Sequence, residues 1–168
     1  MDFFDNNSYS KEAEPYPKME GIKQDYKFGR RLYNSYSGTT SELTTILQYI
    51  NENISCETST EMKNVLLKIA IEEMHHLKIL GDLLVKLGFT PYYMGSRNNK
   101  WCSDNVKYKF YSTDEMLKYN IEGEKDAIRE YKNLIELTDQ KCIKNLLRRI
   151  IKDEENHIKI FNSLQSYE

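Results

Sequence analysis

Two short segments of the chain place a glutamate three residues before a histidine, Glu73 with His76 and Glu154 with His157. Residues at positions i and i+3 of an α-helix lie on the same face, so each pair could hold one ion. Two more glutamates occupy otherwise apolar helical faces, which gives the candidate set Glu42, Glu73, His76, Glu124, Glu154 and His157. Mixed carboxylate and imidazole ligation suits iron or manganese; zinc also accepts it, whereas calcium does not favour histidine.

The candidate set repeats along the chain. Glu124 follows Glu42 by 82 positions, and Glu154 follows Glu73 by 81 positions. The same register pairs two tyrosines that each stand seven residues after a glutamate, Tyr49 and Tyr131. Taken singly, each acidic residue has an ordinary explanation as a solvated face, and Glu42 could complete a capping box with Thr39. The repetition across both halves of the chain favours a shared metal site.

The residues that position this set are predicted to be helical. Apolar side chains recur at steps of three and four over four segments: residues 25–53, 58–87, 112–135 and 139–164. Thr58 with Glu61 and Ser112 with Glu115 are typical capping boxes. Gly88 is expected to close the second helix, and Asp139 is a plausible N-cap for the fourth.

The lengths of the connections predict an all-α, four-helix bundle built from two antiparallel hairpins. The turns near Cys56 and Asp139 are short, whereas residues 88–112 are long enough to cross the length of the bundle. Each candidate glutamate lies about 22 Å from the turn of its own hairpin, at 1.5 Å per residue. We expect both turns at the same end of the bundle, so that all four carboxylates meet in one layer.

The negative charge of four buried carboxylates indicates that such a layer would hold cations. Four buried carboxylates repel one another, and an uncompensated buried charge costs several kcal/mol or more. The apolar faces that carry these glutamates contain no lysine or arginine. Two divalent cations would balance four carboxylates, and two neutral imidazoles would complete a set of six ligands.

Further residues could support these ligands. A histidine ligand needs a hydrogen-bond acceptor that fixes its ring, and Glu72 and Asp153 could each reach the imidazole of the opposite hairpin, or could simply be exposed. Tyr49 and Tyr131 could bond a ligand carboxylate or fill the core. His75 is rejected as a ligand, because its register would place charged residues on the apolar face.

Composition limits the class of protein. The 168 residues carry 24 basic and 26 acidic side chains, a formal net charge of -2, which gives no footprint for nucleic acid or an anionic membrane. No apolar run approaches the roughly 20 residues that span a bilayer, and no signal peptide is visible. We therefore expect a cytoplasmic protein with an irregular N-terminal arm (1–24) and one bundle domain (25–168) that includes the crossover 88–112.

The segments that carry the candidate residues resemble the ferritin-like di-metal carboxylate proteins, especially the rubrerythrin and bacterioferritin branch. The resemblance covers about residues 26–165 and rests on SELTTILQY, IAIEEMHHLKILGDLLVKLG, IEGEKDAIREY and RIIKDEENHIKIF. It implies a di-iron centre held by the six candidate residues and a reaction with peroxide or oxygen. The segment NSYSGTTSEL and the spacing from Glu42 to Glu73 are also similar to manganese catalases and related coat-associated proteins.

The chain also departs from the rubrerythrin pattern. Its three cysteines (Cys56, Cys102 and Cys142) include no CxxC pair for a rubredoxin domain, so electrons would come from a separate donor. The extra glutamate of rubrerythrins is absent, because Ile121 and Ala127 occupy its candidate positions. We expect a homodimeric di-iron oxidoreductase of the peroxidase or ferroxidase type. The alternatives are a manganese catalase with two manganese ions, and an iron-handling or structural, coat-associated bundle.

Overall fold

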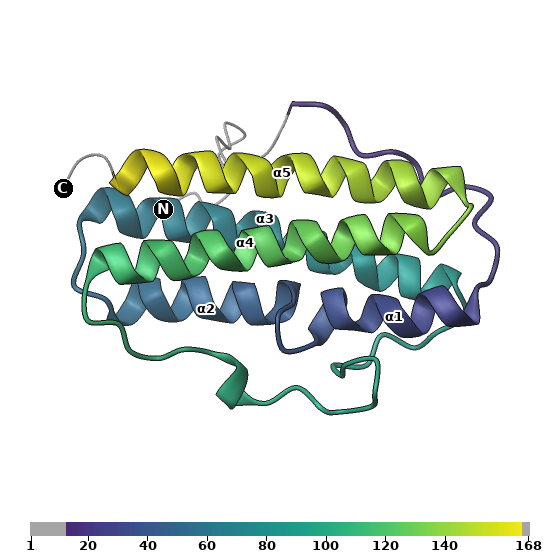
Figure 1. The fold of residues 1–168 in the computed structure, drawn as a ribbon, viewed down its shortest axis with the longest axis horizontal. Helices are drawn as coiled ribbons and strands as arrows, with labels where there is room; N and C mark the ends of the chain where they lie inside the picture. The colour runs from purple at the N-terminus through teal and green to yellow at the C-terminus, as the bar shows by residue number, and fades with distance from the viewer. Residues whose placement is uncertain (1–12, 166–168) are drawn as a thin grey trace.

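The computed structural model describes residues 13–165, and the helices of that part of the chain form an all-α bundle (Figure 1). The helices are α1 (Tyr26–Ser37), α2 (Glu42–Ser55), α3 (Thr60–Lys86), α4 (Thr113–Glu136) and α5 (Lys141–Gln165), with a short 3-10 turn at Ser103–Asn105. α1 and α2 follow one another along one edge and together occupy the place of a single long helix. The predicted four-helix architecture with one long crossover is therefore confirmed.

The prediction of one continuous helix over residues 25–53 is wrong, because the helix is interrupted between Ser37 and Glu42. Gly38 leaves the helix in an extended conformation, and a Cβ there would lie 2.6 Å from the carbonyl oxygen of Asn34, so this exit requires glycine. The Ser41 hydroxyl donates to the carbonyl of Gly38 over 2.8 Å. Local hydrogen bonds of this kind compete with the helical ladder, and they make Glu42 the first residue of a new helix.

Serine hydroxyls cap α2, α3 and α4, whereas the Asp25 carboxylate caps α1. Ser112 accepts the N–H of Glu115 over 3.1 Å, as the predicted box requires, but the Glu115 carboxylate accepts from the N–H of Tyr111 over 2.8 Å. The box predicted at Thr58 does not form, and neither does the alternative box at Thr39, since Ser59 and Ser41 take the capping role instead. Both positions fall in runs of consecutive hydroxyl residues, where the residue types alone do not choose the cap.

The other predicted helix ends differ in outcome. Gly88 closes α3 as predicted: its φ is 89°, its N–H bonds the carbonyl of Val85, and the next N–H bonds that of Leu84. This pair of bonds is the Schellman motif, which favours glycine at the left-handed position. Asp139 is not the N-cap of α5, because the helix begins at Lys141 and Gln140 precedes it directly.

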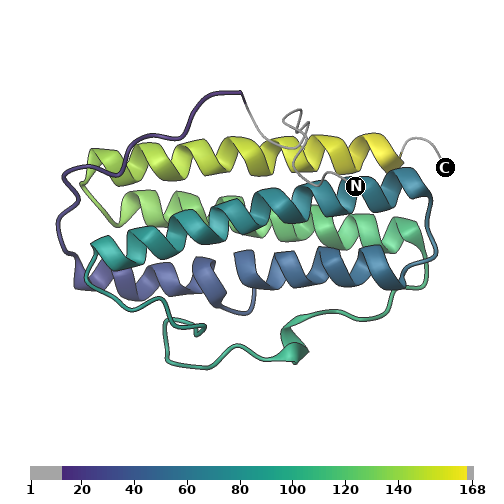
Figure 2. The same ribbon diagram turned by 180° about the vertical axis from the view of Figure 1, so that it is seen from behind.

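The two hairpin turns lie at opposite ends of the bundle, which corrects the expectation that they share one end. In Figures 1 and 2 the α2–α3 turn and the α4–α5 turn are at opposite ends. The crossover returns the chain to the end where α2 finishes, so that α4 runs away from it. The candidate residues still meet, because about 22 Å is close to half of the roughly 40 Å length of the 27-residue helix α3.

The buried apolar residues form two clusters along the bundle axis. One cluster contains Leu83 and Leu147, and the other contains Leu66 and Phe161. Polar residues near the middle of the helices separate them. Within residues 13–165, no helix is long and apolar enough to cross a membrane.

Candidate metal centre

The six candidate residues from the sequence lie together in the interior, between the two apolar clusters. The side chains come from α2, α3, α4 and α5, and none is more than 4% exposed. The residues that share this burial are Glu42, Glu73, His76, Glu124, Glu154 and His157. The bundle therefore holds four carboxylates and two imidazoles in one layer.

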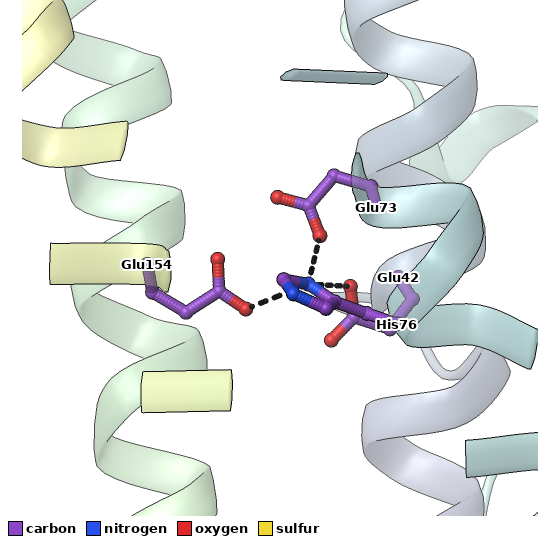
Figure 3. Close-up of side chains that lie close together, drawn as sticks. All are labelled: Glu42, Glu73, His76 and Glu154. Carbon is purple, nitrogen blue, oxygen red and sulfur yellow. Dashed lines mark hydrogen bonds and ion pairs between the residues drawn. The ribbon is translucent and has the colours of Figure 1, made fainter. Parts of the chain in front are cut away.

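Three carboxylates surround the ring of His76 (Figure 3). Its Nδ1 atom lies 3.0 Å from an oxygen of Glu73, 3.3 Å from one of Glu154 and 3.7 Å from one of Glu42. The ligand-type atoms of these four residues all lie within 4.8 Å of one another. They could enclose one cation.

The surroundings of His157 nearly repeat this arrangement. Its Nδ1 atom lies 3.0 Å from Glu73, 3.1 Å from Glu154 and 3.7 Å from Glu124. These four residues form a second group within the same 4.8 Å limit. Glu73 and Glu154 belong to both groups, so they are placed to bridge two neighbouring cations.

The carboxylates of this layer influence one another strongly. Burial first, and then the negative charge of Glu73, hold the pKa values of Glu42 and Glu124 well above their usual range. Burial also opposes ionisation of Glu73, but its hydrogen bond with Glu42 and the nearby imidazoles hold its pKa well below that range. Protons are therefore shared within the layer, which carries less than four full negative charges.

The two imidazole rings also take part in this sharing of protons. Burial opposes their protonation, yet the carboxylates of Glu73 and Glu154 raise the pKa of both His76 and His157 well above the usual value. Bound cations would take the place of these protons, because a metal ligand must be a deprotonated carboxylate or a neutral imidazole.

Several atoms of the layer have no hydrogen-bond partner, which tests whether cations fit there. Among residues 13–165, these buried atoms include Oε1 of Glu73, both carboxylate oxygens of Glu154 and Nδ1 of His157, whose contacts of 3.0–3.3 Å with one another and with His76 are not aligned as hydrogen bonds. Buried polar atoms are rarely left without a partner, and an ion is one of the recognised reasons. Because the unpaired atoms are ligand types that face one another, the residues fit a pair of divalent cations.

The two predicted tyrosines have different surroundings. Tyr49 donates its hydroxyl hydrogen bond to Oε1 of Glu124. Tyr131 is buried, and its hydroxyl has no hydrogen-bond partner within residues 13–165. One tyrosine thus orients a candidate ligand, while the other leaves a polar group free.

Of the two predicted acidic supports, Asp153 reaches the opposite hairpin and Glu72 does not. Asp153 Oδ2 lies 3.3 Å from Nε2 of His76 and 2.6 Å from a guanidinium nitrogen of Arg149. Glu72 lies 3.8 Å from the same Nε2 atom on its own helix, because positions i and i+4 share a face. His75, rejected as a ligand, is half-exposed and close to Glu72.

A residue that sequence reasoning missed completes these surroundings. The hydroxyl oxygen of Tyr16, from the non-helical segment 13–25, lies 2.5 Å from Asp153 Oδ2, 2.9 Å from Glu72 Oε1 and 3.1 Å from Nε2 of His76. The arm has no hydrophobic period that could place it against a helix. The only available signal was a tyrosine held between two prolines, Pro15 and Pro17, whose backbones are stiff.

Comparison with known families identifies the group to which the chain belongs. A family model described as a ferritin-like domain matches residues 38–166. The chain belongs to the ferritin-like family. A search of curated proteins finds no match.

Solved structures extend the similarity of this ferritin-like chain. A manganese catalase from Anabaena is 25% identical, with 93% of this chain and 79% of that chain covered and a TM-score of 0.83. A Rhodobacter capsulatus bacterioferritin, described with a metal-free dinuclear site and haem iron, is 22% identical over 87% of this chain and 88% of its own, with a TM-score of 0.71. A Desulfovibrio desulfuricans bacterioferritin with a di-iron site is 21% identical over 84% and 79%, with a TM-score of 0.70. The two bacterioferritins show a shared fold, and together with the buried cluster the comparisons indicate a di-metal carboxylate protein.

A small cavity opens beside the layer of this ferritin-like bundle. Its volume is about 10 Å³, and all four candidate glutamates, together with Tyr131, border it. It shares three lining residues, Thr40, Thr45 and Gly123, with a surface groove between α2 and α4. The groove and the cavity therefore adjoin at these residues, and a Cβ at Gly123 would meet no atom within 4 Å.

Proposed function

We propose that this chain is a di-metal oxidoreductase that acts on hydrogen peroxide, with Glu42, Glu73, His76, Glu124, Glu154 and His157 as the ligands. The observation that carries the proposal is the sharing of Glu73 and Glu154 by two ligand groups at the wall of one small cavity. The cavity has room for about one water-sized molecule, which favours a very small substrate and excludes large organic ones.

The reaction that we favour is dismutation, in which two H₂O₂ give two H₂O and one O₂. Bound manganese would supply two-electron redox chemistry: the two electrons that one peroxide gives up on oxidation to O₂ would reduce the next peroxide to water, so no other reductant is needed. Support for manganese comes from the similarity to the Anabaena manganese catalase, which extends over 93% of this chain. Carboxylate-rich ligation is also suited to manganese.

The protein's own groups would bind and orient the peroxide. The free hydroxyl of Tyr131 borders the cavity and can hydrogen-bond a peroxide oxygen. Tyr49 holds Oε1 of Glu124, and thereby fixes the position of this carboxylate at the cavity wall. The two apolar clusters on either side of the layer exclude bulk water from the reacting atoms.

The test begins with metal analysis of the full chain purified without chelators. We expect two manganese ions per chain, and oxygen release of one mole for every two moles of peroxide without added reductant. Glu73→Gln should lose both metal and activity, because it removes a bridging carboxylate, whereas the exposed Glu61→Gln should keep both. A chain that retains neither manganese nor iron would refute the proposal.

A second candidate is a di-iron centre that reduces peroxide or oxygen with electrons from a separate donor. The donor set favours it, because four carboxylates with two imidazoles suit iron as well as manganese. Protein loaded anaerobically with ferrous iron should then develop a ferric absorption band with peroxide and consume a reductant. Oxygen release without a reductant would exclude it in favour of dismutation.

A further inference from the structure

The two candidate metal positions differ in what surrounds the Nε2 atom of their histidine, which is the ring nitrogen on the outer side, away from the ligand carboxylates. We propose that Tyr16 of the N-terminal arm is a positioning residue for His76, and that it makes the position held by Glu42 and His76 the tighter of the two. The inference rests on the di-metal centre of the proposed function, but it does not depend on which reaction the centre performs.

The tautomer of His76 explains what Tyr16 does. Nδ1 of His76 faces the cation position, since the three nearest layer carboxylates surround this atom. A cation on Nδ1 leaves the ring proton on Nε2, which must donate a hydrogen bond. The Tyr16 oxygen at 3.1 Å is the closest acceptor, ahead of Asp153 at 3.3 Å.

Tyr16 passes this hydrogen bond to a charged group. Its own hydroxyl donates to Asp153 Oδ2 over 2.5 Å, and Arg149 holds that carboxylate at 2.6 Å. The ring of Tyr16 lies over the Arg149 guanidinium at 4.4 Å, and the backbone carbonyl of Glu14 accepts from the same side chain. The arm is therefore attached to α5 at the point where Tyr16 meets His76.

The equivalent side of His157 has no such arrangement. Nε2 of His157 is buried, and it finds no hydrogen-bond partner among residues 13–165. On the side that faces the other ligands, the two histidines are nearly equivalent. The distance from Nδ1 to the Glu154 carboxylate is 3.3 Å for His76 and 3.1 Å for His157. The difference between the two positions thus comes from the outer side.

Glu72, His76 and Asp153 also form a group that could hold a cation of its own. Arg149 already pairs with Asp153, and the Tyr16 hydroxyl donates to Asp153 and lies within hydrogen-bond distance of Glu72. A third cation would have to displace these donors, so the geometry supports a hydrogen-bonded anchor for His76 instead.

Hydrogen bonds to the outer nitrogen fix a ligand's ring and raise its basicity, and their loss typically costs 10–100-fold in metal affinity. A calorimetric titration of metal-free protein with Mn²⁺ under anaerobic conditions should therefore show two binding steps whose Kd values differ by at least about 10-fold. Electron paramagnetic resonance gives a second readout, because a lone Mn²⁺ and a coupled pair have different spectra. One equivalent should produce mainly the lone-ion signal.

The variants assign the steps. Tyr16→Phe keeps the ring over Arg149 and should weaken the tight step by about 10-fold or more while the weak step is unchanged. His76→Ala should remove the tight step, and His157→Ala the weak one. The matched control is Tyr33→Phe, which loses a tyrosine hydroxyl bonded to the Thr90 carbonyl outside the layer and should change neither step.

Two equal steps in the unaltered protein, or a Tyr16→Phe variant that shifts both steps or neither, would overturn the inference. Peroxide turnover is measured separately on the same samples. Unequal steps that respond to Tyr16 in a protein without peroxide activity would support this inference and refute the proposed function. Equal binding steps in a protein that turns over peroxide would refute this inference and support the proposed function.

Discussion

Glu52 offers a quantitative test of the electrostatics of the bundle, because it is a fully buried carboxyl outside the metal layer. Its two oxygens accept hydrogen bonds from the side-chain amides of Gln48, at 2.8 Å, and Asn120, at 2.7 Å. Burial raises the pKa of Glu52 from 4.5 to about 7, although these two bonds act in the opposite direction. The native state thus holds a proton on Glu52 that the unfolded chain releases near pH 4.5.

This difference has a definite sign and size. A native pKa above the unfolded one stabilises the native state fully below pH 4.5, and the stabilisation disappears as the pH rises through about 7. Each pKa unit corresponds to 1.36 kcal/mol, so the free energy of unfolding should fall by about 3 kcal/mol over this interval. Glu52→Gln cannot titrate, and it should lack this part of the fall.

The assay is urea unfolding of metal-free protein at several values between pH 4.5 and 7.5. We expect the stability difference between Glu52→Gln and the unaltered chain to shift by about 3 kcal/mol in favour of the variant as the pH rises. Gln48→Leu is the matched control, because it removes one of the two bonds that lower the pKa of Glu52 but keeps the titrating carboxyl, so its pH dependence should be at least as large as that of the unaltered chain. Parallel curves for Glu52→Gln and the unaltered chain would refute the reasoning.

Two further predictions concern the metal centre and the route to it. If each of two ions is present at 100 times its Kd, removal of the metal by a chelator should lower the free energy of unfolding by about 5 kcal/mol. The Tm should fall by on the order of 10–20 °C. An unchanged Tm in calorimetry would contradict a cation pair in the layer. Gly123→Leu should leave the metal content unchanged and slow peroxide turnover by roughly tenfold, the effect of about 1.4 kcal/mol added to the barrier. Gly123→Ala is its control and should stay active, so equal rates for both variants would exclude this route.

The sequence was sufficient to predict that six distant residues meet in one layer, because the spacing of Glu73 and His76 recurs at Glu154 and His157 within a helical period. It did not show the break at Gly38, since the apolar stripe continues in phase on both sides of the interruption. Tyr16 was not predictable, because segment 13–25 has no period and its position depends on tertiary contacts with Arg149.

The attachment of the arm has a consequence for the symmetry of the molecule. The pattern of candidate residues repeats between the two hairpins, and Glu73 and Glu154 belong to both groups of candidate ligands. A homodimer of single hairpins could build the same six-residue centre, but an isologous contact would give both halves identical surroundings. Joining the halves in one polypeptide removes that requirement, so the arm can serve His76 alone, and within residues 13–165 Nε2 of His157 has no such partner.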